Sequence, residues 1–481
     1  MSAAYETEPR RWRQPWTDAE VWLLAGAVVP AVWLGRQPLV AVCWAIVVVA
    51  VRRSPRRVTL ALGAGVLSIV GAARSEQAWR DVEPRQLGDF AGWARLASDP
   101  EPVGAGVTVV LEIEGERFRT IAYGSPRRRL VDRQAGDLAE VRGERVELGD
   151  GDRWLRTRHV VGRFRLDRVG ATTEGAALDR ASNRLRDRLR DAASATMGDD
   201  DAALFTGLVV GDDVRQRDQV VDRFRAVGLS HLTAVSGQNV AYVISVAGVW
   251  LRRLRPWWRL GATWGLIAWF VVLTRVEPSV VRAGVMAGLG ALAVATGRDR
   301  SVPRLLALTV AVLTLVDPLL VWSVGFWLSC GATAGVSIVG PWLVRRWRGP
   351  VWLALPLSST VGAQIGVLVP SVVVFGRMPA LGVVANLLAI PVAGFVMLVG
   401  MPAALLASVV PGAVATVVMA PAAFGTHWVA TVAELAERFA PEGAAATTVW
   451  AVQVVLALWW WRRPRAGHDE TTMNEPSRIR V

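Results

Sequence analysis

Polar residues stand out in one apolar stretch of this sequence. Residues 228–242 read Gly-Leu-Ser-His-Leu-Thr-Ala-Val-Ser-Gly-Gln-Asn-Val-Ala-Tyr and continue as an apolar run to Trp250. Because a polar side chain at hydrocarbon depth loses water and needs a partner, it is kept mainly where it lines a cavity or a pathway. The Ser236-Gly237 pair predicts a local break in the helix. An α-helix turns by 100° per residue, so the remaining polar residues lie on one face of the predicted helix or at the margin of that face. They are His231, Gln238, Asn239, Tyr242 and Ser245.

Single polar groups recur in later apolar runs. Arg282 lies inside the run 278–296, and a cation at that depth requires a negative partner, which is either Glu277 at the preceding interface or a phosphate. Asn386 and Gln364 stand alone in long apolar runs. These groups and the stripe around His231 serve either as pore lining or as hydrogen bonds between neighbouring helices, and the sequence leaves both roles open.

Acidic and histidine residues give little support for catalysis. Asp212 and Asp213 precede a helical pattern, which fits either a helix cap or a cation site. We expect no catalytic residue, no metal and no cofactor, because no His-x-His-x-Asp-His set can be assembled for a two-metal site. The histidines are dispersed along the chain: His159, His231, His427 and His468.

Apolar runs of near membrane length must position these side chains. Hydrophobic residues make up 52% of the 481, and the charged 20% concentrate between the runs. The sequence therefore predicts a polytopic α-helical membrane protein of roughly 10–12 spans. The expected runs are 21–34, 38–51, 58–73, 229–250, 260–274, 278–296, 305–316, 321–343, 351–375, 379–399, 400–424 and 445–461.

Arginine clusters indicate the orientation of these runs. All 54 basic residues are arginine, and they outnumber the 41 acidic ones. Clusters at residues 10–13, 52–57, 252–259, 298–304, 345–348 and 462–465 fall where the positive-inside rule requires a cytoplasmic end. We therefore expect a multi-pass cell-membrane protein with both termini in the cytoplasm and the segment after the third run outside.

That segment carries a β pattern. Alternating runs at 107–113, 117–123, 138–148 and 154–166, separated by glycine turns, predict an OB-like antiparallel β-barrel outside the membrane. Its aromatic and basic residues match those with which single-strand binders stack bases and hold phosphates, although the same aromatics also suit a barrel core. The candidate DNA-binding residues are Phe118, Tyr123, Trp154, Arg127, Arg128 and Arg129.

A basic amphipathic helix follows the β segment. Leu178, Leu185 and Leu189 recur near helical spacing, and arginines occupy much of the remainder. The helix lies either on the membrane surface, which we favour, or against the barrel with a solvated arginine face.

Several blocks together resemble the ComEC competence family, over nearly the whole chain. They are TGLVVGDD from Thr206, GLSHLTAVSGQNV from Gly228, PSVVRAGVMAGLGALAVATG from Pro278, DPLLVWSVGFWLSCGATAG from Asp317 and NLLAIPVAGFV from Asn386. The resemblance implies an inner-membrane channel that admits single-stranded transforming DNA during natural competence. Many members continue into a metallo-β-lactamase-like domain, for which this sequence holds no motif.

The expected partners follow from that resemblance. They are single-stranded DNA, the lipid bilayer, a separate DNA receptor, a nuclease and a cytoplasmic ATP-driven motor. The motor must be a separate protein because this sequence has no phosphate-binding Gly-x4-Gly-Lys motif. Whether the chain forms a homo-oligomer stays open. The alternatives are a transporter of another small or anionic solute and a membrane enzyme acting on a lipid or wall precursor.

We accordingly divide the sequence into five segments. They are 1–73 with the N-terminal spans, 74–175 with the OB-like domain, 176–228 with amphipathic and interfacial helices, 229–464 with the competence-type channel core, and 465–481 as a disordered cytoplasmic tail.

Overall fold

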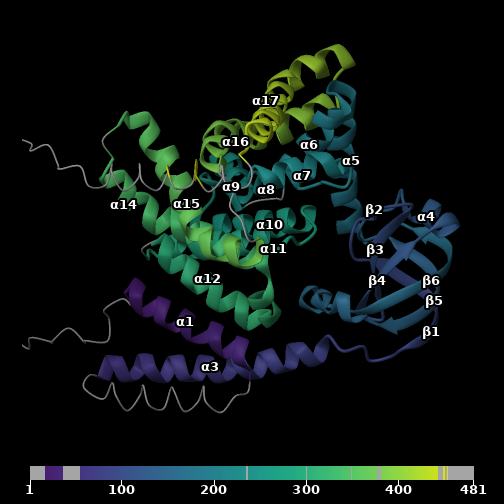
Figure 1. Cartoon of the computed structure of the whole chain (residues 1–481), viewed down its shortest axis with the longest axis horizontal. Helices are drawn as coiled ribbons and strands as arrows, with labels where there is room; N and C mark the ends of the chain where they lie inside the picture. Colours follow the sequence, from purple (N-terminus) through teal and green to yellow (C-terminus); the bar gives the residue numbers. More distant parts are fainter. Residues whose placement is uncertain are drawn as a thin grey trace, which may run out of the picture.

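The structure is a computed structural model that describes residues 17–35, 55–233, 237–298, 301–347, 349–375 and 381–441, together with 448, 449 and 452. A small sheet domain lies to one side of a larger group of helices (Figure 1). The expected run 38–51 and the tail 465–481 lie outside the described residues, as does nearly all of 445–461.

Two helices precede the sheet domain. α1 (Asp18–Leu34) begins at a capping box, in which Thr17 and Glu20 bond each other's backbone amides. α3 (Pro55–Asp81) packs against it, with the hydroxyl of Ser75 donating to the carbonyl of Val32 at 2.7 Å. The end of α3 packs against the hydrophobic core of the sheet domain, so α3 joins the two parts of the molecule.

The sheet has six strands in the order β1-β5-β6-β4-β3-β2, and β1 pairs with β3 as well as with β5. β4 and β6 are parallel, and every other pairing is antiparallel. The short helix α4 (Gly124–Leu130) lies between β4 and β5 in the chain, and the 3₁₀ segment η2 (Asp150–Arg158) between β5 and β6. The strands are β1 (Gly88–Leu96), β2 (Glu101–Val103), β3 (Gly106–Ile113), β4 (Glu116–Ala122), β5 (Leu138–Glu147) and β6 (Val160–Thr173).

The predicted strands compare well with the observed ones, with two corrections. β3, β4 and β5 confirm the expected strands at 107–113, 117–123 and 138–148. The strand expected at 154–166 is wrong in its first half, because residues up to Arg158 form η2. β1 was not predicted, since Gly-Asp-Phe-Ala-Gly-Trp-Ala-Arg-Leu has little apolar alternation, and its pairing with β5 along most of its length explains why it is a strand.

Two helices of the segment 176–228 follow the sheet. α5 (Ala177–Thr196) packs against α6 (Asp199–Val210) and against three later helices, α10 (Pro256–Leu273), α16 (Gly382–Ala407) and α17 (Gly412–Arg438). Its buried face includes Arg186, which is only 1% exposed, so the alternative of a solvated arginine face against the barrel does not hold at that position. The carboxylates of Asp199, Asp200 and Asp201 occupy the first turn of α6, where they oppose the positive end of the helix dipole.

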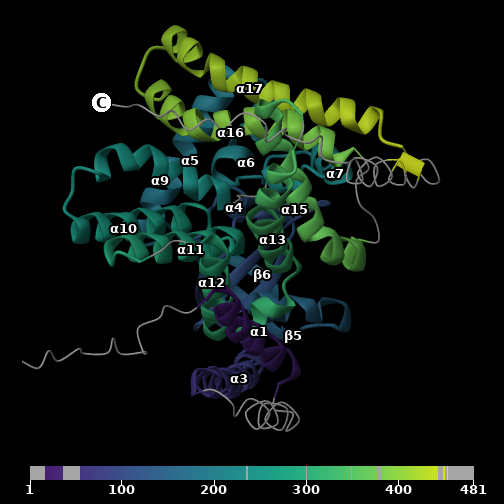
Figure 2. The ribbon, with the colours of Figure 1, turned by 90° about the vertical axis from the view of Figure 1, so that its left-hand side faces the viewer.

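The remaining helices form most of the molecule (Figures 1 and 2). They are α7 (Asp218–Ala226), α8 (Ser230–Thr233), α9 (Gly237–Leu251), α10 (Pro256–Leu273), α11 (Pro278–Ala295), α12 (Val302–Val316), η3 (Pro318–Trp322), α13 (Val324–Ala334), the π-helical η4 (Gly335–Val339), α14 (Gly340–Arg345), α15 (Val351–Phe375), α16 (Gly382–Ala407) and α17 (Gly412–Arg438).

Six helices of the described residues are long and apolar enough to cross a membrane: Val58–Asp81, Pro278–Ala295, Val324–Arg345, Val351–Val374, Gly382–Ala407 and Gly412–Arg438. This is fewer than the roughly 10–12 spans expected from sequence, partly because α1, α9 and α12 have 17, 15 and 15 residues. The expected boundary between two runs at Gly400 is also wrong, since α16 continues to Ala407.

Helices α13 and α15 cross with their backbones in contact. A Cβ added at Gly335 would lie 1.9 Å from the carbonyl oxygen of Gly362, and one at Gly331 would lie 2.3 Å from that of Gly366. Each helix therefore presents a small residue every fourth position, which is how membrane helices approach closely without a hydrophobic driving force. The crossing places the polar faces of both helices beside one cavity.

Candidate conduit between the sheet domain and the membrane helices

A cavity of about 3600 Å³ extends from the sheet domain into the helices. Its lining comes from β1, η2 and the start of α5 on the domain side, and from α9 to α13, α15 and α16 among the helices. At the turn between α9 and α10 it also reaches Arg252 and Arg259. A single space thus joins a basic rim on the sheet domain to a second basic rim on the helices.

The rim on the sheet domain is formed by η2. Trp154 and Arg158 line the cavity, and the guanidinium of Arg158 stacks over the Trp154 ring at 5.0 Å. The indole is 52% exposed, so one of its faces stays available. Arg153, beside them, pairs with Asp150 at 3.0 Å. An exposed aromatic face next to guanidinium groups can stack a base and hold a phosphate.

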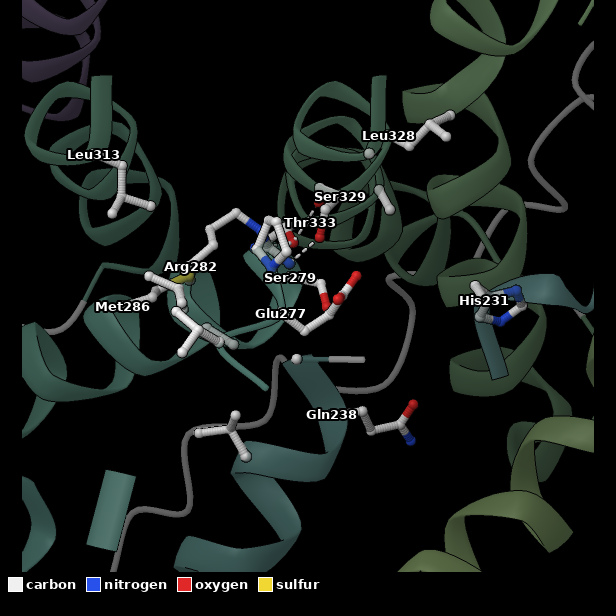
Figure 3. A pocket seen from close by; sticks show the side chains of 18 of the residues that line it. His231, Gln238, Glu277, Ser279, Arg282, Met286, Leu313, Leu328, Ser329 and Thr333 are labelled. Atoms are coloured by element: carbon white, nitrogen blue, oxygen red, sulfur yellow. Dashed lines mark hydrogen bonds between the residues drawn. The ribbon is translucent and has the colours of Figure 1, made fainter. Parts of the chain in front are cut away.

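A buried arginine lines the cavity deeper in the helices. Arg282 of α11 is 5% exposed, and its guanidinium donates to the hydroxyl of Thr333 at 3.1 Å and to that of Ser329 (Figure 3). Glu277, one of the two partners considered from sequence, forms no ion pair with it, and neither does any other carboxylate of the described residues. Hydroxyl oxygens are neutral acceptors, so the charge of Arg282 is hydrogen-bonded but not neutralised.

Hydroxyl and amide side chains continue along the cavity wall from Arg282. Ser329, Thr333 and Ser337 recur every four residues on α13 and η4, so they share one face. Thr360, Gln364 and Ser371 line the cavity from α15. Of these side chains, sequence reasoning singled out only Gln364. The four-residue spacing of hydroxyls inside an apolar run was the signal that could have found the others.

The predicted stripe is divided between the cavity and the protein core. His231, Gln238 and Ser245 line the cavity, as does Asn386. Asn239 does not: it is 2% exposed and donates to the carbonyl of Leu208 at 2.9 Å, which ties α9 to α6.

Tyr242 also lies off the cavity lining. Its hydroxyl accepts a hydrogen bond from Gln238 and lies against Gly394 of α16. The expected helix is interrupted, because α8 ends at Thr233 and α9 begins at Gly237, and Ser236 falls outside the described residues. The prediction that His231 and Gln238 share one face of a continuous helix is therefore wrong.

A network of buried charges joins the sheet domain to the helices beside the cavity. Asp99, which follows β1, accepts two bonds from Arg275 at 2.8 and 3.0 Å and one from Arg186 at 3.2 Å. Arg186 also contacts Asp212 at 3.2 Å, and Arg190 bonds the other oxygen of Asp212. Burial by itself would raise the pKa of Asp99, but the two arginines outweigh it and hold that pKa below its usual value.

Asp212 is therefore a member of an ion-pair network. Its carboxylate faces Arg186 and Arg190 rather than the start of a helix, so the expected helix cap is wrong there; α7 begins only at Asp218. Burial and the proximity of Asp212 raise the pKa of Asp213, whose backbone carbonyl closes a turn with Gln216. Within the described ranges, no group of three or more His, Cys, Asp or Glu side chains could hold a metal ion.

A second contact closes the opposite side of the junction. His159 lies 3.0 Å from Asp317, and Leu319 of η3 is fully buried in the hydrophobic core of the sheet domain. Trp322 of the same segment packs edge-on against Trp79 of α3. The sheet domain is thus attached to the helices through the Asp99 network and through the contacts of Asp317 and Leu319 with His159 and the sheet core.

The other sheet-domain residues chosen from sequence lie in different surroundings. Phe118 is fully buried in the sheet core, so the expectation that it stacks a base is wrong. Tyr123 is 57% exposed and does not line the cavity. Arg127, Arg128 and Arg129 lie exposed on α4, and the last two line a separate pocket of about 340 Å³ with Arg133.

The fold and the cavity together define a membrane protein in which a sheet domain adjoins an internal space whose largely apolar wall carries several polar side chains. A family model described as Competence protein matches residues 208–464. That match covers more than half of the chain, and the chain belongs to this family.

Two relatives extend the comparison. The chain is 27% identical over 208 residues to the Uncharacterized protein YcaI of Escherichia coli (strain K12), covering 40% of this chain and 28% of that protein. It is 27% identical over 225 residues to ComE operon protein 3 of Bacillus subtilis (strain 168), covering 45% of this chain and 28% of that protein. The matched part thus spans just over a quarter of each relative. No solved structure matches the chain.

Proposed function

We propose that this protein is a conduit through which single-stranded DNA crosses the cell membrane during natural competence. The observation that carries the proposal is the cavity, which begins at the basic and aromatic rim of η2 and continues past Arg282 to Arg252 and Arg259. Its wall carries cationic and hydroxyl groups at depths where polar side chains are costly, which suits an anionic and polar passenger. Membership of the Competence protein family supports the same role.

The sheet domain in this proposal is an OB-like barrel that receives the strand. Pairing of β1 with both β5 and β3 returns the sheet on itself, and the parallel pair of β4 and β6 fits the five-stranded Greek-key barrel that binds oligonucleotides. Trp154 and Arg158 are the contacts we assign to the strand, and the exposed arginines of α4 are a second basic surface. The domain lies outside the cell, as the arginine distribution of the sequence predicts.

The chemistry of transport is non-covalent in this scheme. Each phosphate of the strand exchanges water for a guanidinium or hydroxyl donor, and each base exchanges stacking on its neighbours for contact with the wall. We assign no catalytic residue and no cofactor to the chain. Force is supplied by a separate cytoplasmic motor, and strand removal by a separate nuclease.

Obstructing the cavity tests the proposal directly. Gly248 of α9 lines the cavity, and a Cβ added there meets no heavy atom within 4 Å, so Gly248→Trp introduces an indole into the path without a clash at its Cβ. Gly265 of α10 is equally unobstructed but does not line the cavity, which makes Gly265→Trp the matched control.

The assay measures entry of labelled DNA into a nuclease-protected pool in a gene deletion complemented with each variant, after membrane levels are matched. We expect wild type and Gly265→Trp to restore entry and Gly248→Trp to abolish it. Restoration by both variants would place the path elsewhere. Normal entry in the deletion of a demonstrably competent strain would refute the DNA role and favour another transported solute.

A further inference from the structure

Arg282 has unused hydrogen-bond donors at a buried position, where a cation is costly. Its guanidinium carries five N–H groups, and bonds to Ser329 and Thr333 engage two of them. Its Nε has no hydrogen-bond partner among the described residues. Arg282 is four residues beyond Pro278, the first residue of α11, so its Cα lies about 6 Å along the helix axis from that of Pro278.

Of the two hydroxyls, that of Ser329 is free to share an anion with this arginine, while that of Thr333 orients the guanidinium. Thr333 donates its own proton to the carbonyl of Ser329 at 2.9 Å, so its lone pairs face the guanidinium. Ser329 accepts from the other terminal nitrogen, and both hydroxyls line the cavity beside Arg282 (Figure 3). The Ser329 hydroxyl can rotate to donate to an incoming oxygen, because a serine hydroxyl is both donor and acceptor.

From this geometry we infer that Arg282, Ser329 and Thr333 form a binding site for one phosphate oxyanion at a time. The inference rests on the proposed function, in which the anion is a phosphodiester of the passing strand. The guanidinium fork exchanges its two neutral acceptors for two phosphate oxygens, and charge-assisted bonds of this kind are about twice as strong as neutral ones. Arg282 carries a single positive charge, so one phosphodiester neutralises it, and the strand is held by one backbone group at this site.

Two substitutions of Arg282 distinguish the effect of its charge from the effect of its planar shape. Lysine at this position would supply the charge without the planar fork, whereas glutamine would supply hydrogen bonds without the charge. Arg282→Lys and Arg282→Gln therefore separate a phosphate contact from a packing role. If Arg282 only ties α11 to α13, the effects of the two substitutions on binding should not follow the charge that each one leaves.

The experiment uses the full chain in phosphatidylcholine nanodiscs and a fluorescent 12-nucleotide oligothymidylate as the probe. The dissociation constant is measured over a range of salt concentrations, because each phosphate contact to a single strand contributes about 0.7 to the slope of log K against log salt. Arg188→Gln is the control, since Arg188 is exposed on α5 and does not line the cavity.

We expect Arg282→Gln to weaken binding about tenfold or more and to lower the slope by about 0.7. Arg282→Lys should keep the slope and lose part of the affinity, and Arg188→Gln should match wild type. An unchanged slope in Arg282→Gln would overturn the site, as would an equal loss of slope in Arg282→Lys and Arg282→Gln.

Inorganic phosphate distinguishes the site from the proposed function. If wild type binds no oligothymidylate, the DNA role fails, and equilibrium dialysis with labelled phosphate then decides the site alone. Phosphate retained by wild type and by Arg282→Lys but lost in Arg282→Gln would support an anion site with another passenger. Equal retention in all three proteins would overturn it, and Arg282→Lys keeps the test informative if Arg282→Gln fails to fold.

Discussion

Replacing Arg186 with methionine should weaken the attachment of the sheet domain to the helices. Methionine keeps much of the side-chain volume but removes a guanidinium that is 1% exposed and contacts Asp99 and Asp212 at 3.2 Å each. The same guanidinium bonds the carbonyl of Leu273 at 3.1 Å. Breaking a buried ion pair from one side costs about 3–5 kcal/mol, because the remaining charge stays buried.

The structure places the loss near the lower limit of that range. Arg275 still pairs with Asp99, and Arg190 still pairs with Asp212, so neither carboxylate becomes isolated. We therefore expect Arg186→Met to reduce the free energy of unfolding by about 3 kcal/mol. Removing the excess negative charge with Asp212→Asn in the same protein should recover part of that loss.

Thermal unfolding in detergent, followed both by circular dichroism and by protease cleavage at the junction, measures the effect. Arg184→Met is the control, since Arg184 is exposed on the same helix and should change stability by no more than about 0.5 kcal/mol. Equal midpoints for the two arginine variants would refute the reasoning. Strict additivity of Arg186→Met and Asp212→Asn would show that the two residues do not interact.

Three further outcomes follow from single positions. Gly335→Val should abolish folding or lower the thermal midpoint strongly, because its Cβ would lie 1.9 Å from the carbonyl oxygen of Gly362; yield of monodisperse protein measures this. Partial desolvation and repulsion by Asp213 raise the pKa of Glu101, an exposed residue of β2, so its ionised form is mildly destabilising above that raised pKa and not below about pH 4. Glu101→Gln should therefore raise the thermal midpoint at pH 7 and leave it unchanged near pH 4. Trp154→Ala should weaken oligothymidylate binding by about 1–3 kcal/mol per base stacked, measured by fluorescence anisotropy.

Matched controls accompany these variants. Gly325→Val should be tolerated, because a Cβ at Gly325 meets only the Ser323 hydroxyl at 3.9 Å. Trp93→Ala removes an indole that is also 52% exposed but does not line the cavity, and it should leave oligothymidylate binding unchanged. A stability gain of Glu101→Gln that is equal at both pH values would contradict the assigned cause, and a binding loss shared by both tryptophan variants would remove Trp154 from the strand contacts.

The sequence by itself determined the kinds of elements and much of their order. Apolar length identified most of the membrane helices, and alternation identified β3, β4 and β5, because both are local properties of a chain facing lipid or one side of a sheet. It also singled out Arg282, His231, Gln238 and Asn386, since polar groups in apolar runs are rare enough to be informative.

Only the tertiary structure decided which polar groups share a space. Asn239 and Phe118 have the right chemistry for the conduit but face the core, because helix packing and sheet pairing set the direction in which each side chain points. Arg186 reads from sequence as a solvated arginine, yet it meets Asp99 and Asp212 from distant parts of the chain. Such pairings depend on which segments far apart in sequence come into contact, and no local pattern contains that information.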